Sequence, residues 1–152
     1  MFKFKKVILA AALTAFGTLS LAQNASAQET ARFTGALSYD ATLTKGAISV
    51  TAYIGEISNV SSQYATYPLT VEFKLCNKPY SPKTAKSTFC STVATQNLDA
   101  LNPLQYFSGF SISSYGPQRV KKGTYIPVLI IGSQSARGYY DYINFKKKLT
   151  IK

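Results

Sequence analysis

Reactive side chains are few in this sequence, and those that are missing limit its chemistry most. The chain has no histidine, so it lacks the commonest general base, the Ser-His-Asp and Cys-His nucleophilic sites and the usual zinc sites. Glycoside hydrolysis needs only two carboxylates, but the acids form no recognisable paired motif. They are Glu29, Asp40, Glu56, Glu72, Asp99 and Asp141. We therefore expect no catalytic residue, no metal site and no cofactor.

The remaining polar features are typical of binding rather than catalysis. Three basic groups fall in segments that lack a strand pattern, and each is a candidate for contact with an anion. These groups are Lys78, Lys83 and Lys86; Arg119, Lys121 and Lys122; and Lys146, Lys147 and Lys148. Each group alone is more typical of a solvated turn, so an anion site requires the fold to bring two of them to one end of the domain.

Tyrosine gives a second hypothesis, because the chain has eleven tyrosines and no tryptophan. Exposed tyrosine rings beside lysines stack on sugars or bases. The candidates for this role are Tyr64, Tyr67, Tyr139 and Tyr140. The alternative is ordinary strand packing, since tyrosine favours sheets.

Residues 1–27 have the three-part pattern of a secretory signal peptide. A basic start is followed by an uncharged apolar run, Val7 to Leu21, and then by Ala25-Ser26-Ala27, a small-x-small cleavage motif. The run is shorter than the roughly 20 residues that span a bilayer. We expect cleavage between Ala27 and Gln28, a periplasmic or secreted protein, and no integral membrane anchor.

Residues 28–152 have the size of a single domain. They carry fourteen basic and six acidic side chains, a formal charge of +8. Such an excess favours anionic partners, namely polysaccharide, lipid headgroups or nucleic acid, although solubility alone also accounts for it.

Cys76 and Cys90 are predicted to form a structural disulfide. The compartment is oxidising and the cysteine count is even, whereas a catalytic redox pair is usually closer in sequence. The cross-link closes a loop of about 15 residues, worth roughly 3 kcal/mol through the entropy of the unfolded chain.

The elements that must position these residues are strands, because period-two alternation recurs between turn signals. Leu69–Cys76 is the clearest, with its apolar residues on one face and Glu72 on the other. Phe33, Gly35, Leu37 and Tyr39 are predicted to share one face of a first strand. The apolar run from Tyr125 to Ile131 predicts a central strand covered on both faces, and Pro127 within it predicts a bulge or an edge.

About seven such strands favour an all-β fold, an antiparallel two-sheet sandwich of immunoglobulin-like type. A closed barrel is the alternative.

Several segments, in order, resemble the immunoglobulin-like accessory domains of secreted bacterial proteins, in the manner of the bacterial cell-adhesion-related (CARDB-like) domain. These segments are 48–59, 69–75 with Pro79-Tyr80 after it, 123–125 and 139–145. The resemblance covers most of residues 28–152. It implies a sandwich with an interaction role, and it brings no catalytic residues to this sequence.

Together these observations predict an exported, non-enzymatic binding or adhesion module that engages an anionic surface or glycan. The alternative is a protein-binding factor, such as an inhibitor, a toxin component or a self-assembling subunit, because small exported sandwiches can add strands between subunits.

Overall fold

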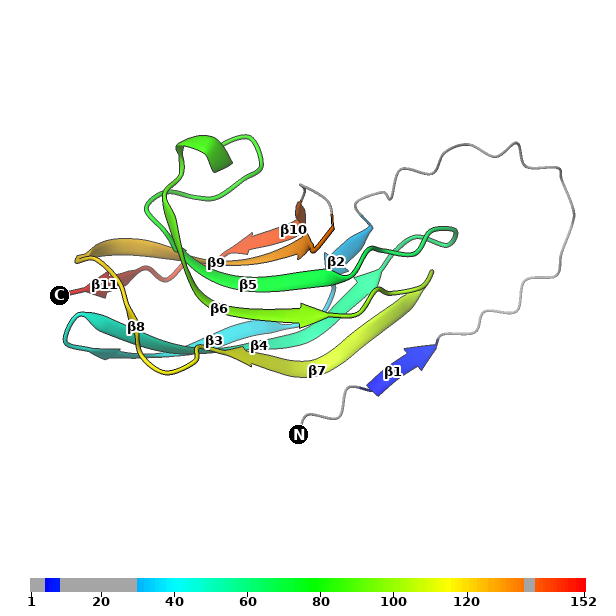
Figure 1. Ribbon diagram of the computed structural model, residues 1–152, viewed down its shortest axis with the longest axis horizontal. Helices are drawn as coiled ribbons and strands as arrows, with labels where there is room; N and C mark the ends of the chain where they lie inside the picture. Colours follow the sequence, from blue (N-terminus) through cyan, green and yellow to red (C-terminus); the bar gives the residue numbers. More distant parts are fainter. Residues whose placement is uncertain (1–4, 9–29, 136–138) are drawn as a thin grey trace, which may run out of the picture.

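The computed structural model describes residues 5–8, 30–135 and 139–152, which form two antiparallel sheets packed as a sandwich (Figure 1). The predicted fold class is therefore confirmed. The barrel alternative is wrong, because the strands divide between two separate sheets. Apart from Lys5–Ile8, the predicted leader and its cleavage site lie outside the described residues.

Sheet A contains β1 (Lys5–Ile8), β2 (Ala31–Phe33), β3 (Leu37–Thr44), β4 (Ala47–Asn59), β7 (Gln105–Ser113) and β8 (Gln118–Arg119). Sheet B contains β5 (Leu69–Cys76), β6 (Cys90–Leu98), β9 (Gly123–Ser133), β10 (Tyr139–Asn144) and β11 (Leu149–Ile151). A 3-10 turn, η1 (Ala85–Ser87), lies in the loop between β5 and β6.

Seven long strands underlie these elements, as the alternation predicts. β2 and β3 are halves of one interrupted strand along β4, and β10 and β11 are halves of another along β9. Sheet A then reads β2/β3–β4–β7, and sheet B reads β10/β11–β9–β5–β6. This is the immunoglobulin-like plan with the fourth long strand, β6, paired to β5 in the second sheet.

The outer edge of β7 also pairs with β1, antiparallel, over Lys5–Ile8. β1 falls within the predicted leader. On its other edge, β7 pairs with β4.

The core lies between the sheets and is built from the inward positions of both. Leu69, Val71, Phe73 and Leu75 of β5 are fully buried, as their alternation predicts. They pack with residues such as Ile54 of β4 in one continuous apolar cluster. Burying a side chain of this size contributes roughly 1.5–3 kcal/mol, which is what holds the two sheets together.

The predicted first strand is wrong in one respect, since it is interrupted at residues 34–36. The register with β4 shifts from Ala31↔Asn59 before the interruption to Leu37↔Ile54 after it. The backbones approach closely here: a Cβ on Gly35 would lie 2.6 Å from the Glu56 nitrogen. Only glycine fits such a contact, so Gly35 marks a break rather than a position on a regular face.

Pro127 lies in β9 beside the break between β10 and β11, in agreement with the predicted irregularity. The Phe145 amide donates to the Pro127 carbonyl at 2.9 Å, but proline has no N–H with which to continue the ladder on that side. The pairing of β10 with β9 ends at Asn144↔Val128, and the pairing of β11 with β9 begins at Leu149↔Tyr125. The interruption places Lys146, Lys147 and Lys148 in an exposed connection.

Candidate functional site

Basic residues gather at one end of the sandwich because most of them occupy every second connection between the long strands, while Lys146, Lys147 and Lys148 lie in the break between β10 and β11 beside that end. In an antiparallel fold, successive connections alternate between the two ends. The connections β3–β4, β5–β6, β7–β9 and β10–β11 lie at or beside one end, which we name the basic end (Figure 1). It carries Lys45, Lys78, Lys83, Lys86, Arg119, Lys121, Lys122, Lys146, Lys147, Lys148 and Lys152.

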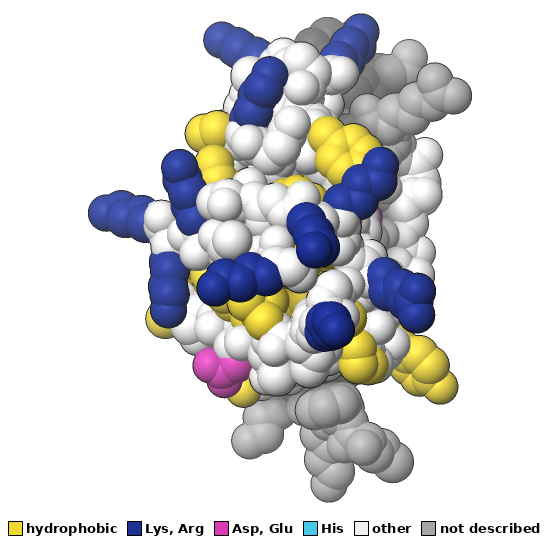
Figure 2. Space-filling view, turned by 90° about the vertical axis from the view of Figure 1, so that its left-hand side faces the viewer, with side chains coloured by type: hydrophobic (Ala, Val, Ile, Leu, Met, Phe, Trp, Pro, Cys, Tyr) yellow, Lys and Arg dark blue, Asp and Glu magenta, His cyan; other side chains and the backbone are white. Residues whose placement is uncertain are grey.

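All side chains in this set are exposed, and none forms an ion pair with another described residue. Figure 2 looks onto the basic end and shows Lys and Arg side chains spread across it, with acidic side chains only near its margin. The three predicted groups therefore come together at one end. Clustered like charges repel one another, so the arrangement produces a positive field that an anionic partner would relieve.

The opposite end has a different character. It is formed by residues 60–68 and 99–104 and by the connection after β9, and its described residues include no lysine or arginine. Apart from those at the basic end, the lysines and arginines described after residue 29 are Arg32 and Lys74, which lie within strands. Among the described residues, the charge asymmetry thus runs along the length of the sandwich.

The carboxylates of sheet A lie within strands and are held by hydroxyl groups. Asp40 accepts a hydrogen bond from the Tyr53 hydroxyl at 3.0 Å, and this bond raises the pKa of Tyr53. Glu56 accepts from the hydroxyls of Ser58 and Thr34, each at 2.6 Å. These two bonds, that of Ser58 first, hold the pKa of Glu56 below its ordinary value. Neither carboxylate neutralises a lysine of the basic end.

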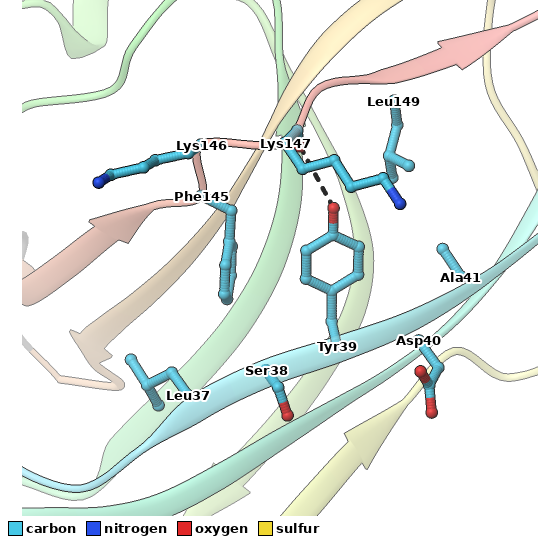
Figure 3. Close-up of a pocket in the computed structure, with 9 residues that line it drawn as sticks. All are labelled: Leu37, Ser38, Tyr39, Asp40, Ala41, Phe145, Lys146, Lys147 and Leu149. Carbon is cyan, nitrogen blue, oxygen red and sulfur yellow. Dashed lines mark hydrogen bonds between the residues drawn. The ribbon is translucent and has the colours of Figure 1, made fainter.

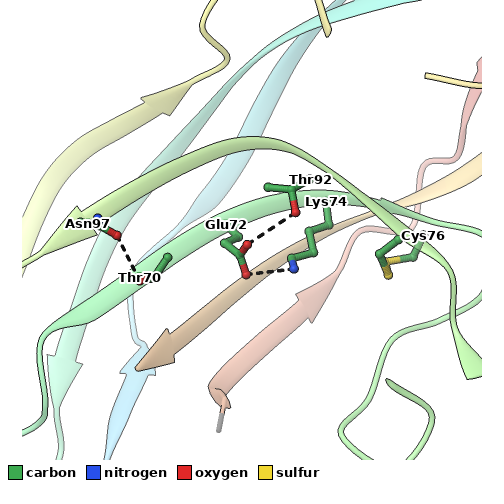
Figure 4. Close-up of polar contacts among 7 residues, drawn as sticks. Thr70, Glu72, Lys74, Cys76, Thr92 and Asn97 are labelled. Carbon is green, nitrogen blue, oxygen red and sulfur yellow. Dashed lines mark hydrogen bonds and ion pairs between the residues drawn. A yellow bond between two sulfur atoms is a disulfide. The ribbon is translucent and has the colours of Figure 1, made fainter. Parts of the chain in front are cut away.

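The carboxylates of sheet B are also engaged locally. Glu72 pairs with Lys74 at 3.0 Å on the outer face of the sheet (Figure 4), as expected for a solvent-facing position. Asp141 accepts from the backbone amides of Phe33 and Tyr142, both at 2.9 Å. None of these four described carboxylates is hydrogen-bonded to another.

The disulfide between Cys76 and Cys90 is present, as predicted. It joins directly paired residues at the end of β5 and the start of β6. The loop that it closes presents Lys78, Lys83 and Lys86 as exposed side chains. The cross-link therefore fixes the base of one of the lysine-bearing loops.

This loop is also anchored by packing over the outer face of sheet B. The Tyr80 ring is 5% exposed and packs with Val128 and Ile130, both fully buried. The side chain of Asn144 forms two hydrogen bonds with the Tyr80 backbone: it accepts from the amide at 2.8 Å and donates to the carbonyl at 2.9 Å. The predicted covering of the apolar central strand on both faces is explained by this loop.

A hollow of about 460 Å³ lies along the seam between β3 and the segment from Phe145 to Leu149 (Figure 3). Tyr39 reaches across it, and its hydroxyl donates to the Lys147 carbonyl at 3.3 Å. Its ring stands edge-on to Phe145 with centroids 4.8 Å apart. Partial burial raises the pKa of Tyr39. The lining thus combines apolar residues with Lys146 and Lys147, and it also includes Asp40.

A second hollow, of about 530 Å³, lies between the β3–β4 turn and the C-terminal residues 150–152. Leu43 and Ile151 supply apolar lining, and Lys45, Lys122 and Lys152 surround it. These three lysines come from separate parts of the sequence. The fold alone brings them to one cavity.

The candidate tyrosines do not join the lysines. Tyr64 and Tyr67 lie in the loop between β4 and β5, at the opposite end. Tyr140 is 7% exposed, and its hydroxyl accepts from the Tyr67 amide at 3.1 Å. The Tyr139 ring packs edge-on against Tyr80 at 5.5 Å. The packing interpretation accounts for Tyr139 and Tyr140, and the structure leaves Tyr67 exposed away from the basic end.

Sequence reasoning missed two residues of the basic end, Lys45 and Lys152. Each stands alone in the sequence, so neither forms a visible charge cluster. For Lys45 the available signal was the alternation itself, since it falls in the same series of connections as the Lys78–Lys86 and Arg119–Lys122 groups.

No protein-family model matches the chain, and neither a curated protein nor a solved structure does. Across the described residues, no helix is long and apolar enough to cross a membrane. The same residues contain no cluster of three or more His, Cys, Asp or Glu side chains able to hold a metal ion.

Proposed function

We propose that this protein is an exported, non-enzymatic binding module whose basic end engages an extended anionic surface. The observation that carries the proposal is the gathering, at one end of the sandwich, of exposed cations from four separate connections that form no ion pair with another described residue. The resemblance to bacterial accessory domains agrees with an interaction role. A glycan or a lipid surface supplies the many regularly spaced anions that such an array requires.

The array is suited to a broad partner rather than to a small ligand. Its lysines are flexible and strongly hydrated point charges, which attract anions without fixing a geometry. Charges that act together accelerate encounter with an oppositely charged surface, and added salt screens this effect beyond about 10 Å at 0.1 M. Binding is therefore expected to be rapid and strongly dependent on salt.

The test compares charge removal at the basic end with charge removal elsewhere, using retention on immobilised heparin. Lys121→Gln with Lys122→Gln is expected to lower the eluting salt concentration. Lys121→Arg with Lys122→Arg, which keeps the charge, serves as the matched control and is expected to elute like the unchanged protein.

Lys74→Gln controls for net charge alone, since Lys74 lies on a strand and pairs with Glu72 at 3.0 Å. The proposal predicts a smaller effect per charge for this variant than for the pair at the basic end. Equal effects per charge would contradict the proposal and leave only non-specific attraction. Capture of a stable protein partner whose binding ignores salt would instead favour the protein-binding alternative.

A further inference from the structure

The basic end also exposes large apolar side chains, one at the end of β3 and one in each of two connections. Leu43 before the β3–β4 turn is 45% exposed, Phe89 in the β5–β6 loop is 55% exposed, and Tyr115 between β7 and β8 is 100% exposed. Single exposed apolar residues are common. Here three of them stand among the lysines, and Figure 2 shows hydrophobic side chains between basic ones on this end.

The backbone holds each of these side chains outward. Leu43 is paired with Ile48 in the β3–β4 hairpin. The Phe89 amide donates to the Asn77 side chain at 3.0 Å, and its carbonyl accepts from the Asn77 amide at 3.0 Å. The Tyr115 carbonyl accepts from the Gln118 side chain at 2.9 Å. Their exposure is thus built into structured turns.

The surface beneath has the same mixed chemistry. Leu43, Lys45 and Lys122 all line the hollow of about 530 Å³. Lysine stems cover apolar surface while their ammonium groups stay in a polar layer, and tyrosine favours the boundary between an apolar phase and water. A partner that matches this surface must offer anions and apolar groups within one thin layer.

We propose that the basic end docks on a phospholipid bilayer with anionic headgroups, its lysines meeting the phosphates while Leu43, Phe89 and Tyr115 enter the headgroup boundary. This inference rests on the proposed function and names its partner. Lysines near an anionic leaflet attract it electrostatically, and stable attachment to a membrane requires a second, apolar contribution. An anionic polysaccharide would use the lysines but would leave the three apolar side chains in water.

The opposite end supplies an internal comparison. Val60, Tyr67 and Leu104 are 53%, 40% and 41% exposed, and the described residues around them include no lysine or arginine. If apolar exposure alone drove membrane contact, this end would insert equally well. If the combination of charge and apolar groups is required, it would stay in solution.

The natural absence of tryptophan allows a direct measurement on the protein as isolated after export. Phe89→Trp and Tyr115→Trp each place one reporter at the basic end, and Tyr67→Trp places the matched reporter at the other end. Vesicles of phosphatidylcholine are compared with vesicles that also contain phosphatidylglycerol, each with and without brominated acyl chains.

Emission from positions 89 and 115 is expected to shift to the blue and to be quenched by bromine only when phosphatidylglycerol is present. Emission from position 67 is expected to change little. Equal quenching at all three positions, or none at positions 89 and 115, would overturn the assignment of this end as the docking surface.

A second measurement separates this inference from the proposed function. Leu43→Ser, Phe89→Ser and Tyr115→Ser are combined in one variant, whose folding is checked by circular dichroism. Partitioning onto the anionic vesicles is expected to fall by about tenfold or more, because the serine side chains no longer bury apolar surface in the headgroup boundary. Heparin retention is expected to stay unchanged. If heparin retention depends on the basic end but the triple variant binds vesicles normally, this inference fails and the anion-binding function stands. If the natural protein shows no salt-dependent binding to either probe, the proposed function fails with it.

Discussion

Replacing Cys76 and Cys90 with alanine tests how far the cross-link, rather than packing, stabilises the lysine-bearing loop. The bridge spans a sequence separation of 14, so it closes a loop of about 15 residues, and the chain-entropy model gives roughly 3 kcal/mol for this length. In the folded protein, the buried Tyr80 ring still anchors the loop after the bridge is removed. The effect is therefore expected to arise mainly in the unfolded chain.

The assay is equilibrium unfolding in urea, followed by far-ultraviolet circular dichroism. A loss of roughly 3 kcal/mol moves the midpoint down by about 1–3 M, given a slope of roughly 1–3 kcal/mol per molar urea. The natural protein, reduced while unfolded and refolded with reductant present, is the control. It keeps both sulfur atoms, so it separates the cross-link from the packing of Cys76, which is fully buried.

Two outcomes would refute the reasoning. If both the reduced protein and the alanine variant lose less than about 1 kcal/mol, the bridge does not act through chain entropy. If only the alanine variant is destabilised, the stabilisation belongs to the packing of the sulfur atoms.

Three further predictions concern polar side chains. Asn144→Ala is expected to lower the free energy of unfolding by about 1–3 kcal/mol in the urea assay, because it leaves the Tyr80 amide and carbonyl without their partners; an unchanged value would show that water replaces both bonds. Burial raises the pKa of Tyr80, so its contribution to stability is complete below pH 10.0 and is lost as the pH rises, when unfolded tyrosine ionises. Tyr80→Phe is expected to flatten the alkaline fall in melting temperature, and a curve with the natural slope would contradict this account. Bonds from the Ser58 and Thr34 hydroxyls lower the pKa of Glu56 below 4.5, so its contribution is present above that pH and is lost on acidification. Glu56→Gln should therefore reduce the acid-induced fall in melting temperature, whereas a steeper fall would show that the carboxylate is not stabilised by these bonds.

Local sequence pattern was sufficient for much of the fold. The alternation in Leu69–Cys76 reproduces the bounds of β5, and its inward residues are fully buried. The spacing of the two cysteines, together with the predicted export, was enough to predict their disulfide. These features depend on a few neighbouring residues, which is why sequence alone could reveal them.

Contacts between distant strands decided the features that pattern missed. The break at Gly35 depends on the approach of the Glu56 backbone, which lies far along the chain. Whether a tyrosine is exposed likewise depends on distant partners. Tyr139 packs against Tyr80, and the Tyr140 hydroxyl accepts a hydrogen bond from the Tyr67 amide. The sequence pattern of a strand predicts which side chains share a face, but it does not predict which distant residues will cover that face.

The candidate site, too, was determined partly by the sequence and partly by the tertiary structure. The sequence by itself determined the excess of positive charge and the three basic groups. Only the tertiary structure decided that these groups, with Lys45 and Lys152, share one end with Leu43, Phe89 and Tyr115. The physical reason is antiparallel alternation: each strand returns the chain across the sandwich, so every second connection meets at one end, however far apart these connections lie in the sequence.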